Sequence, residues 1–155
     1  MSQAYYETIQ LIERLHRRFL DVLKVELDRK HIQDVNNVQA MILFNLGDDE
    51  MTVGELTIRG YYLGSNVSYN VKKMVENGYL DQERSIHDRR SIRVKVSEKG
   101  RKLCDDLDVM FQDHLAKLNA AGIGSENLAR LNKALKALES FWASQSSFQM
   151  PSDAF

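Results

Sequence analysis

The spacing of apolar residues changes at Gly78 from a helical period to strict alternation. Before this glycine, apolar residues recur every three or four positions on one face of a predicted helix: Val67, Val71, Met74 and Val75. After it, residues 79–84 and 91–96 are typical of two strands, with apolar and basic residues on opposite faces of the second. A capped helix followed by a hairpin restricts the chain to an α+β fold, and long helical patterns on both sides make that fold mainly helical.

Five further helices are predicted around this centre. The periodicity indicates a long helix over 5–30, a second over 34–46 capped by Asp34, and two long helices over 98–121 and from Ser125 onwards. A short helix over 53–59 has a capping box, Thr52 with Glu55, and precedes the 65–77 helix, for which Ser65 is the predicted cap. Two short helices joined by a glycine-containing turn form a helix-turn-helix pattern.

The charge of the chain is unevenly distributed along its 155 residues. The net charge is -1, yet residues 52–101 hold ten Lys and Arg against six Asp and Glu, and both flanks are acidic. This places any contact with nucleic acid in the middle of the chain. The absence of a secretory signal, of a membrane-spanning apolar run and of a second cysteine beside Cys104 predicts a cytoplasmic protein.

Other chemistry receives little support from the sequence. The four histidines are scattered without the spacing of a metal site, and no phosphate-binding glycine loop or assignable nucleophile is present. We therefore expect neither an enzyme nor a bound metal or cofactor. Cys104 is interpreted as a buried, inert thiol, with a redox-sensing role as the alternative.

The segment DRRSIRVKVSEKG, residues 88–100, resembles the wing of the MarR family of winged-helix transcription regulators. That wing reads approximately D-R-R-x-x-x-V-x-L-T-x-x-G, and only the Leu-Thr pair differs here, as Val96-Ser97. The resemblance covers roughly residues 5–145. It implies a winged helix-turn-helix over 34–100, between a dimerisation helix over 1–33 and dimerisation helices over 101–146, with a flexible tail over 147–155. The turn at 59–63 and the residues Tyr69 and Asn70 depart from the family pattern, which predicts a DNA preference of the protein's own.

The polar face of the 65–77 helix is the predicted reading head. The major groove accepts one helix, and its base edges are read by Asn and Lys side chains. We expect base contacts from Asn66, Tyr69, Asn70 and Lys73, and phosphate contacts from Ser65, Ser68 and Lys72. The alternative is an ordinary solvated helix face.

The hairpin tip carries Arg89 and Arg90. A wing arginine can enter a narrow, electronegative minor groove, and Arg90 is the first choice for that contact. A structural pair of Asp88 and Arg89 that orders the loop is the alternative for those two residues.

The resemblance also implies partners and regulation. Two apolar lines on the first helix and an apolar seam on the last predict a homodimer, and hence a pseudo-palindromic operator in double-stranded DNA. By resemblance, a small aromatic or phenolic effector would bind near five residues, with ordinary interhelical packing as the alternative: His16, Arg17, Phe19, Met41 and Phe44. The predicted function is sequence-specific transcriptional regulation, most often repression. A winged-helix module that binds proteins and no DNA is the alternative.

Overall fold

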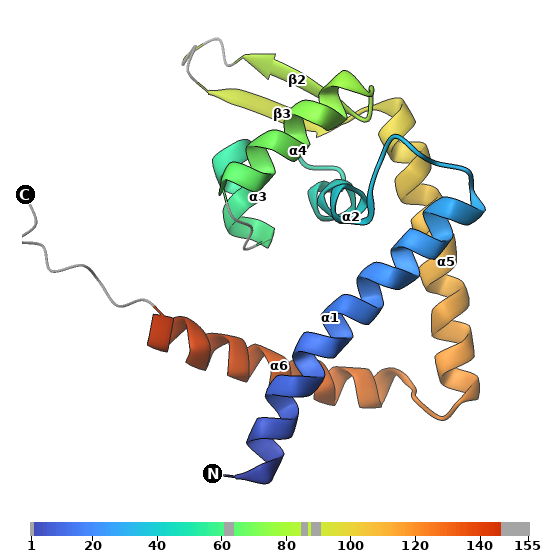
Figure 1. The fold of residues 1–155 in the computed structure, drawn as a ribbon, viewed down its shortest axis with the longest axis vertical. Coiled ribbons are helices and arrows are strands. Elements are labelled where there is room, and N and C mark those ends of the chain that lie inside the picture. Colours follow the sequence, from blue (N-terminus) through green and yellow to red (C-terminus); the bar gives the residue numbers. More distant parts are fainter. Residues whose placement is uncertain (1, 61–63, 85–86, 88–90, 147–155) are drawn as a thin grey trace, which may run out of the picture. The chain divides into compact units, whose positions relative to one another are not determined.

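The computed structural model describes residues 2–60, 64–84, 87 and 91–146. Its helices are α1 (Gln3–Arg29), α2 (Asn37–Leu46), α3 (Val53–Gly60), α4 (Gly64–Glu76), α5 (Glu98–Ala120) and α6 (Ser125–Ser146) (Figure 1). Its strands are β1 (Met51–Thr52), β2 (Leu80–Arg84) and β3 (Ile92–Val96). The chain divides into two compact units, Met1–Leu107 and Asp108–Phe155. The α+β, mainly helical prediction is confirmed.

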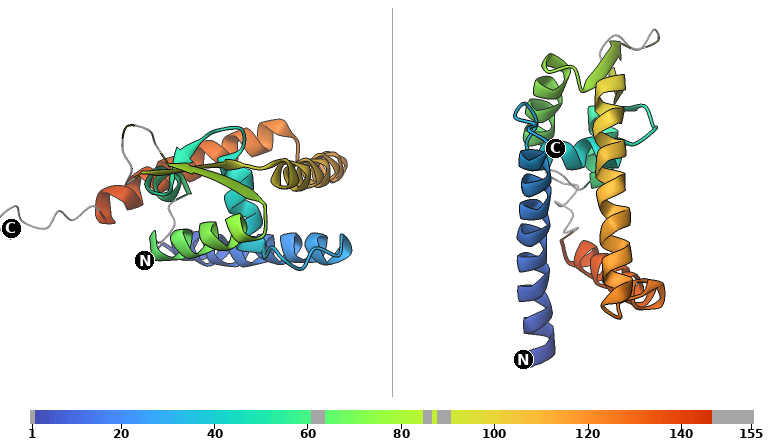
Figure 2. Two further views of the ribbon diagram at one scale, coloured as in Figure 1. Left: turned by 90° about the horizontal axis from the view of Figure 1, so that it is seen from above. Right: turned by 90° about the vertical axis from the view of Figure 1, so that its right-hand side faces the viewer.

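The core of the first unit is centred on α2. This helix contacts α1, α3 and α4, and it buries residues on several faces, including Ala40, Ile42, Leu43 and Leu46. The last turns of α1 contribute Leu23 and Leu27 to this core. The earlier turns of the same continuous helix extend away from the core (Figure 2). Burial of a central apolar helix on several faces therefore holds the three helices around it in place.

The sheet has three antiparallel strands in the order β1-β3-β2. Leu80 pairs with Val96 and Arg84 with Ile92, so β2 and β3 form the predicted hairpin. On β3, Val94 and Val96 are buried, while Ile92 near the outer end is exposed. The strand β1, in which Met51 pairs with Val94, was not predicted. It has two residues, too few for an alternating pattern to be visible in the sequence.

The caps of α3 and α2 show one correct and one wrong prediction. Thr52 Oγ1 accepts the Glu55 N–H at 3.1 Å and the Glu55 carboxylate accepts the Thr52 N–H at 3.1 Å, which confirms the capping box of α3. The cap of α2 is Asn36, because the helix begins at Asn37 and the Asn36 side chain accepts a backbone N–H of its first turn. The prediction of Asp34 as this cap is wrong, since its carboxylate is bound by residues from other elements.

Candidate nucleic-acid interface

The helix α4 has one face in the core and one face outside. Val67, Val71 and Met74 are buried, as predicted. The helix ends where Gly78 adopts a φ of +82°, and the N–H of Tyr79 donates to the Met74 carbonyl at 2.8 Å. Glycine takes this left-handed conformation without a steric penalty, so it is well suited to the predicted stop. At the other end the helix begins at Gly64, one residue before the predicted cap Ser65.

The outer face of α4 carries most of the residues that we expected to contact DNA. Asn66, Ser68 and Lys72 are exposed, and Tyr69 is 61% exposed. Lys73 is more restrained, since its Nζ lies 3.4 Å from Glu76 Oε2 and 5.9 Å from the centre of the Tyr69 ring. The packing of three apolar residues on the inner face thus directs these polar side chains outwards.

Asn70 is the exception on this helix. It is half-buried, and its Oδ1 accepts a hydrogen bond from Gln39 Nε2 at 3.1 Å. Gln39 is a residue of α2 that the sequence interpretation did not include in the site. The spacing of a capping box, Asn36 followed three residues later by Gln39, is the signal that would have drawn attention to it.

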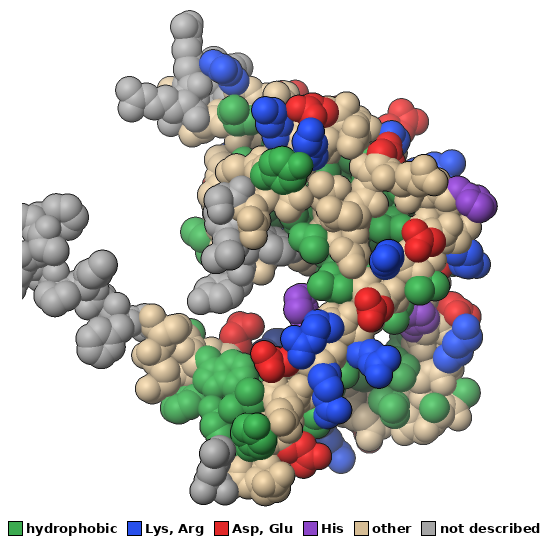
Figure 3. Space-filling model, in the orientation of Figure 1, with side chains coloured by type: hydrophobic (Ala, Val, Ile, Leu, Met, Phe, Trp, Pro, Cys, Tyr) green, Lys and Arg blue, Asp and Glu red, His purple; other side chains and the backbone are tan. Residues whose placement is uncertain are grey.

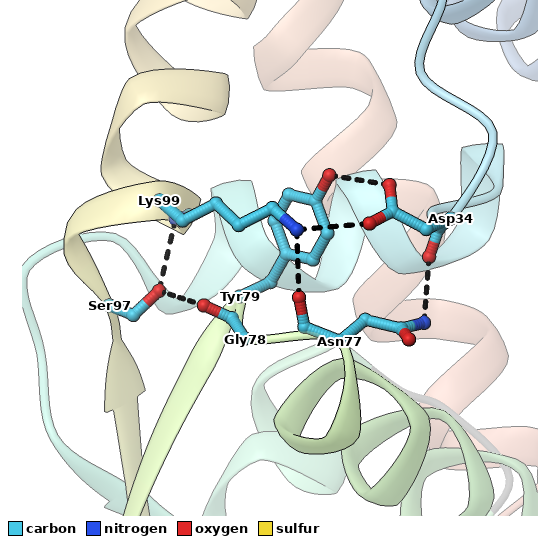
Figure 4. A network of polar contacts seen from close by, with 7 residues as sticks. Asp34, Asn77, Gly78, Tyr79, Ser97 and Lys99 are labelled. Atoms are coloured by element: carbon cyan, nitrogen blue, oxygen red, sulfur yellow. Dashed lines mark hydrogen bonds and ion pairs between the residues drawn. The ribbon is translucent and has the colours of Figure 1, made fainter.

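The end of α4 is bound to two other elements through Asp34 (Figure 4). Tyr79 Oη donates to Asp34 Oδ1 at 2.7 Å, and Asn77 Nδ2 donates to the Asp34 carbonyl at 3.0 Å. From the first turn of α5, Lys99 Nζ donates to Asp34 Oδ2 at 3.0 Å and to the Asn77 carbonyl at 2.9 Å. The same Nζ lies 4.3 Å above the centre of the Tyr79 ring. This network joins the α1–α2 connection, the end of α4 and the start of α5.

The network changes the acidity of its members. Desolvation raises the pKa of Asp34, but hydrogen bonds from Tyr79 and Lys99 and the charge of Lys99 outweigh it, so the pKa lies below the ordinary 3.8. Burial, and then the hydrogen bond to the Asp34 carboxylate, raise the pKa of Tyr79 well above the ordinary 10.0. At neutral pH the pair is therefore a phenol donating to a carboxylate.

Replacing Tyr79 by phenylalanine is expected to lower the free energy of unfolding by about 1 kcal/mol at pH 7, because one part-buried hydrogen bond to a charged acceptor is lost. A carboxylate with a depressed folded pKa stabilises the protein above its unfolded pKa and loses this effect as the pH falls through its folded pKa. The difference between wild type and Tyr79→Phe should consequently shrink below about pH 4. Urea unfolding at pH 7 and pH 3 measures this difference in the free energy of unfolding. Tyr6→Phe, on the exposed start of α1, is the control. An equal cost at both pH values would contradict this role of Asp34.

Part of the basic surplus of residues 52–101 is bound within the protein. Among the residues that the structure describes, four of these cations pair with acids from the segment before them: Arg59 with Asp49, Arg93 with Glu50, Lys99 with Asp34, and Arg101 with Asp48. Exposed pairs of this kind contribute little stability, but they hold the cations close to the protein. Lys72, Arg84 and Lys95 are exposed and form no ion pair with another described residue.

These three cations belong to α4, β2 and β3. Figure 3 shows Lys and Arg side chains near α4 and the wing, with acidic side chains among them. Arg84 and Lys95 lie on β2 and β3 and were not included among the predicted contacts. Asp88, Arg89 and Arg90, which carry the minor-groove hypothesis, lie outside the described residues.

The five residues predicted to bind an effector lie on α1 and α2. His16 and Arg17 are exposed, and Phe19, Met41 and Phe44 are half-buried. A hollow of about 460 Å³ lies elsewhere in the first unit, and none of these five residues lines it. Its lining residues come from the end of α1, the network and α5: Lys30, Ile32, Tyr79, Lys99, Lys102, Leu103 and Asp106.

Two further predictions concern reactive groups. Burial raises the pKa of the half-buried Cys104 thiol, and the nearby Asp105 and Asp48 add to this against the opposite effect of Arg101. A thiol with a raised pKa is a weak nucleophile, which supports the interpretation of Cys104 as inert.

Within the described parts of the chain, no group of three or more His, Cys, Asp or Glu residues could hold a metal ion. No described helix is long and apolar enough to cross a membrane.

Comparison with known proteins agrees with this arrangement of a helix-turn-helix and a wing. Residues 35–100 match the family described as winged helix DNA-binding domain. The chain is 37% identical over 139 residues to the exopolysaccharide II synthesis transcriptional activator ExpG of Rhizobium meliloti (strain 1021). The matched region covers 90% of this chain and 72% of that protein.

Solved structures share the fold over nearly the whole chain. Streptococcus pneumoniae FabT in complex with DNA has a TM-score of 0.72 at 19% identity, over 92% of this chain and 99% of that one. Staphylococcus aureus MarR in complex with salicylate and kanamycin has a TM-score of 0.76 at 16% identity, over 94% and 96%. The chain belongs to the MarR family of winged helix-turn-helix transcriptional regulators.

Proposed function

We propose that the protein regulates transcription as a homodimer that reads a pseudo-palindromic operator with the outer face of α4. The observation that carries this proposal is the division of α4 into a buried apolar face and an exposed face with Asn66, Ser68, Tyr69 and Lys72. These side chains include both donors and acceptors, which readout of the major groove requires. The solved complex of FabT with DNA, a protein of the same fold, supports the same use here.

Exposed apolar residues support the homodimer. On α1, Leu15 is 60% exposed and Val25 is 66% exposed, and on α6 Leu131, Leu135 and Phe141 are exposed. Soluble proteins rarely leave such series of large apolar side chains in water, so we propose that a second copy covers them. We propose that dimerisation is mediated by segments 1–33 and 101–146, and that DNA is bound by segment 34–100.

Selection of bound sites from random duplexes tests the proposed function. The expected product is an inverted repeat whose half-sites lie about one helical turn, roughly 10 base pairs, apart, bound by a particle with twice the mass of the chain. Retention of no sequence, together with no salt-dependent affinity for any duplex, would contradict the proposal. That result would favour the alternative of a winged-helix module that binds proteins.

We propose that the protein represses transcription where its operator overlaps the binding site of RNA polymerase. The 37% identical relative is named an activator, which supports activation as a second candidate. A reporter gene with the selected operator placed either over or upstream of its promoter distinguishes the two roles. Repression is expected in the first arrangement, and increased transcription in the second would assign activation.

We also propose that a small aromatic acid or phenol weakens the binding of DNA. The structure of the Staphylococcus aureus protein with salicylate supports the choice of ligand class. The residues around Phe19, Met41 and Phe44 remain the proposed site. Regulation requires different affinities of the ligand for the free and the DNA-bound conformations, so titration of salicylate against the protein–operator complex is the test.

A further inference from the structure

Gln39 uses both ends of its side-chain amide. The residue is 7% exposed and lies in the first turn of α2, where its Oε1 accepts the backbone N–H of Asn36 at 3.1 Å. Its Nε2 donates to Asn70 Oδ1 on α4 at 3.1 Å. A single side chain thus joins the capping box of α2 to the proposed recognition helix.

The orientation of both amides follows from the chemistry of the Asn36 N–H. A backbone N–H can only donate, so the oxygen of Gln39 has to face it. The NH₂ group of Gln39 then faces Asn70, and since two NH₂ groups cannot bond to each other, Asn70 has to present its oxygen. The network therefore fixes the assignment of oxygen and nitrogen in Asn70.

The consequence concerns what Asn70 offers on its free side. Its oxygen faces the buried Gln39 amide through this hydrogen bond, and no other described residue is bound to its Nδ2. The NH₂ group is left to form contacts outside the protein, and that group has donors only. An asparagine that reads adenine in the usual bidentate way needs its oxygen and its NH₂ group together.

We propose that Gln39 is a positioning residue that sets the hydrogen-bonding polarity of Asn70, so that Asn70 reads an acceptor on a base edge. In the major groove these acceptors are N7 and O6 of guanine, O4 of thymine and N7 of adenine, and only guanine and thymine present acceptors without a neighbouring donor on the same base. This inference rests on the proposed function, in which α4 occupies the major groove. It corrects the simpler expectation that Asn70 offers both a donor and an acceptor to a base.

Substituting Gln39→Glu should reverse the hydrogen-bonding polarity of Asn70 and keep the capping box of α2. A glutamate oxygen can still accept the Asn36 N–H, as in the common capping box, and a negative charge is favourable in the first turn of a helix. The second carboxylate oxygen can only accept, so Asn70 has to turn its NH₂ group inwards and its oxygen towards the DNA. The variant should select a base with a donor, which means adenine N6 or cytosine N4.

The experiment is selection from random duplexes with full-length protein. Wild type should enrich guanine or thymine at one position of each half-site, and Gln39→Glu should change that position to adenine or cytosine, by roughly tenfold in relative enrichment. Asn70→Asp should give the same change, because it keeps an acceptor for Gln39 and places another outside. This second variant also keeps the test valid if Gln39→Glu folds poorly.

Asn36→Asp is the matched control. It adds the same charge at the same end of α2, and its carboxylate can still accept the Gln39 N–H that Asn36 Oδ1 now accepts at 2.8 Å. Its selected sequence should equal that of wild type. If wild type selects an operator, and both Gln39→Glu and Asn70→Asp select the same bases as wild type, this inference alone is overturned. If wild type selects no sequence, the proposed function is overturned and the inference with it.

Discussion

Replacing Gly100 by alanine is expected to lower the free energy of unfolding by about 3 kcal/mol, through overpacking in the first turn of α5. A Cβ at this position would collide with the Tyr79 carbonyl oxygen and lie 2.8 Å from Val96 Cγ1. The carbonyl cannot easily move away, because it accepts the Ser97 N–H at 3.0 Å. The predicted loss is measurable by urea unfolding at pH 7, followed by circular dichroism.

Gly54→Ala provides the matched comparison. A Cβ on Gly54 in α3 would meet only Thr52 Oγ1, at an ordinary 3.8 Å. Because alanine is a better helix former than glycine, this variant should be more stable than wild type by up to about 1 kcal/mol. If both substitutions have the same effect, then the close approach of α5 to the start of β2 does not control stability.

The second large effect is expected at Lys72. This exposed cation forms no ion pair with another residue that the structure describes, and Lys72→Ala should weaken the binding of every duplex by roughly tenfold or more at moderate salt. The slope of log affinity against log salt should fall by about one for each protomer, because fewer counterions are released. Asn66→Ala should instead reduce the preference for the operator by about 1–3 kcal/mol at each half-site and leave the binding of random DNA nearly unchanged.

Fluorescence anisotropy with labelled operator and random duplexes separates these two effects. Lys117→Ala is the control for the lost charge, since this lysine lies in the second unit, paired with Asp113. It should leave both affinities and the salt dependence close to those of wild type. Equal losses on operator and random DNA in both the Lys72 and the Asn66 variant would refute the assignment of phosphate and base contacts.

Features determined by near neighbours were predictable from the sequence. The capping box of α3 involves residues three positions apart, and the end of α4 depends on Gly78 and the carbonyls just before it. The buried face of α4 followed from helical periodicity, because Val67, Val71 and Met74 share one side of any helix formed there. These elements also orient the candidate site, which is why its outer face was predictable.

Features that depend on distant residues were not predictable. Asp34 and Asn36 are both good caps, and the bonds of Asp34 to Tyr79 and Lys99, 45 and 65 residues later, hold its carboxylate in another role. The pairing of Arg59 with Asp49 reduces the cationic surface in a way that counting charges cannot show. Gln39 could be recognised as part of a capping box with Asn36, but that spacing does not reveal its bond to Asn70 on α4.

The most direct test of the central claim is the salt dependence of operator binding by the wild-type protein. We predict that the selected operator binds at least about a thousandfold more tightly than a random duplex of equal length. We also predict that the logarithm of both affinities falls linearly with the logarithm of the salt concentration. Equal affinity for the two duplexes, or binding that does not respond to salt, would contradict sequence-specific reading of DNA by α4.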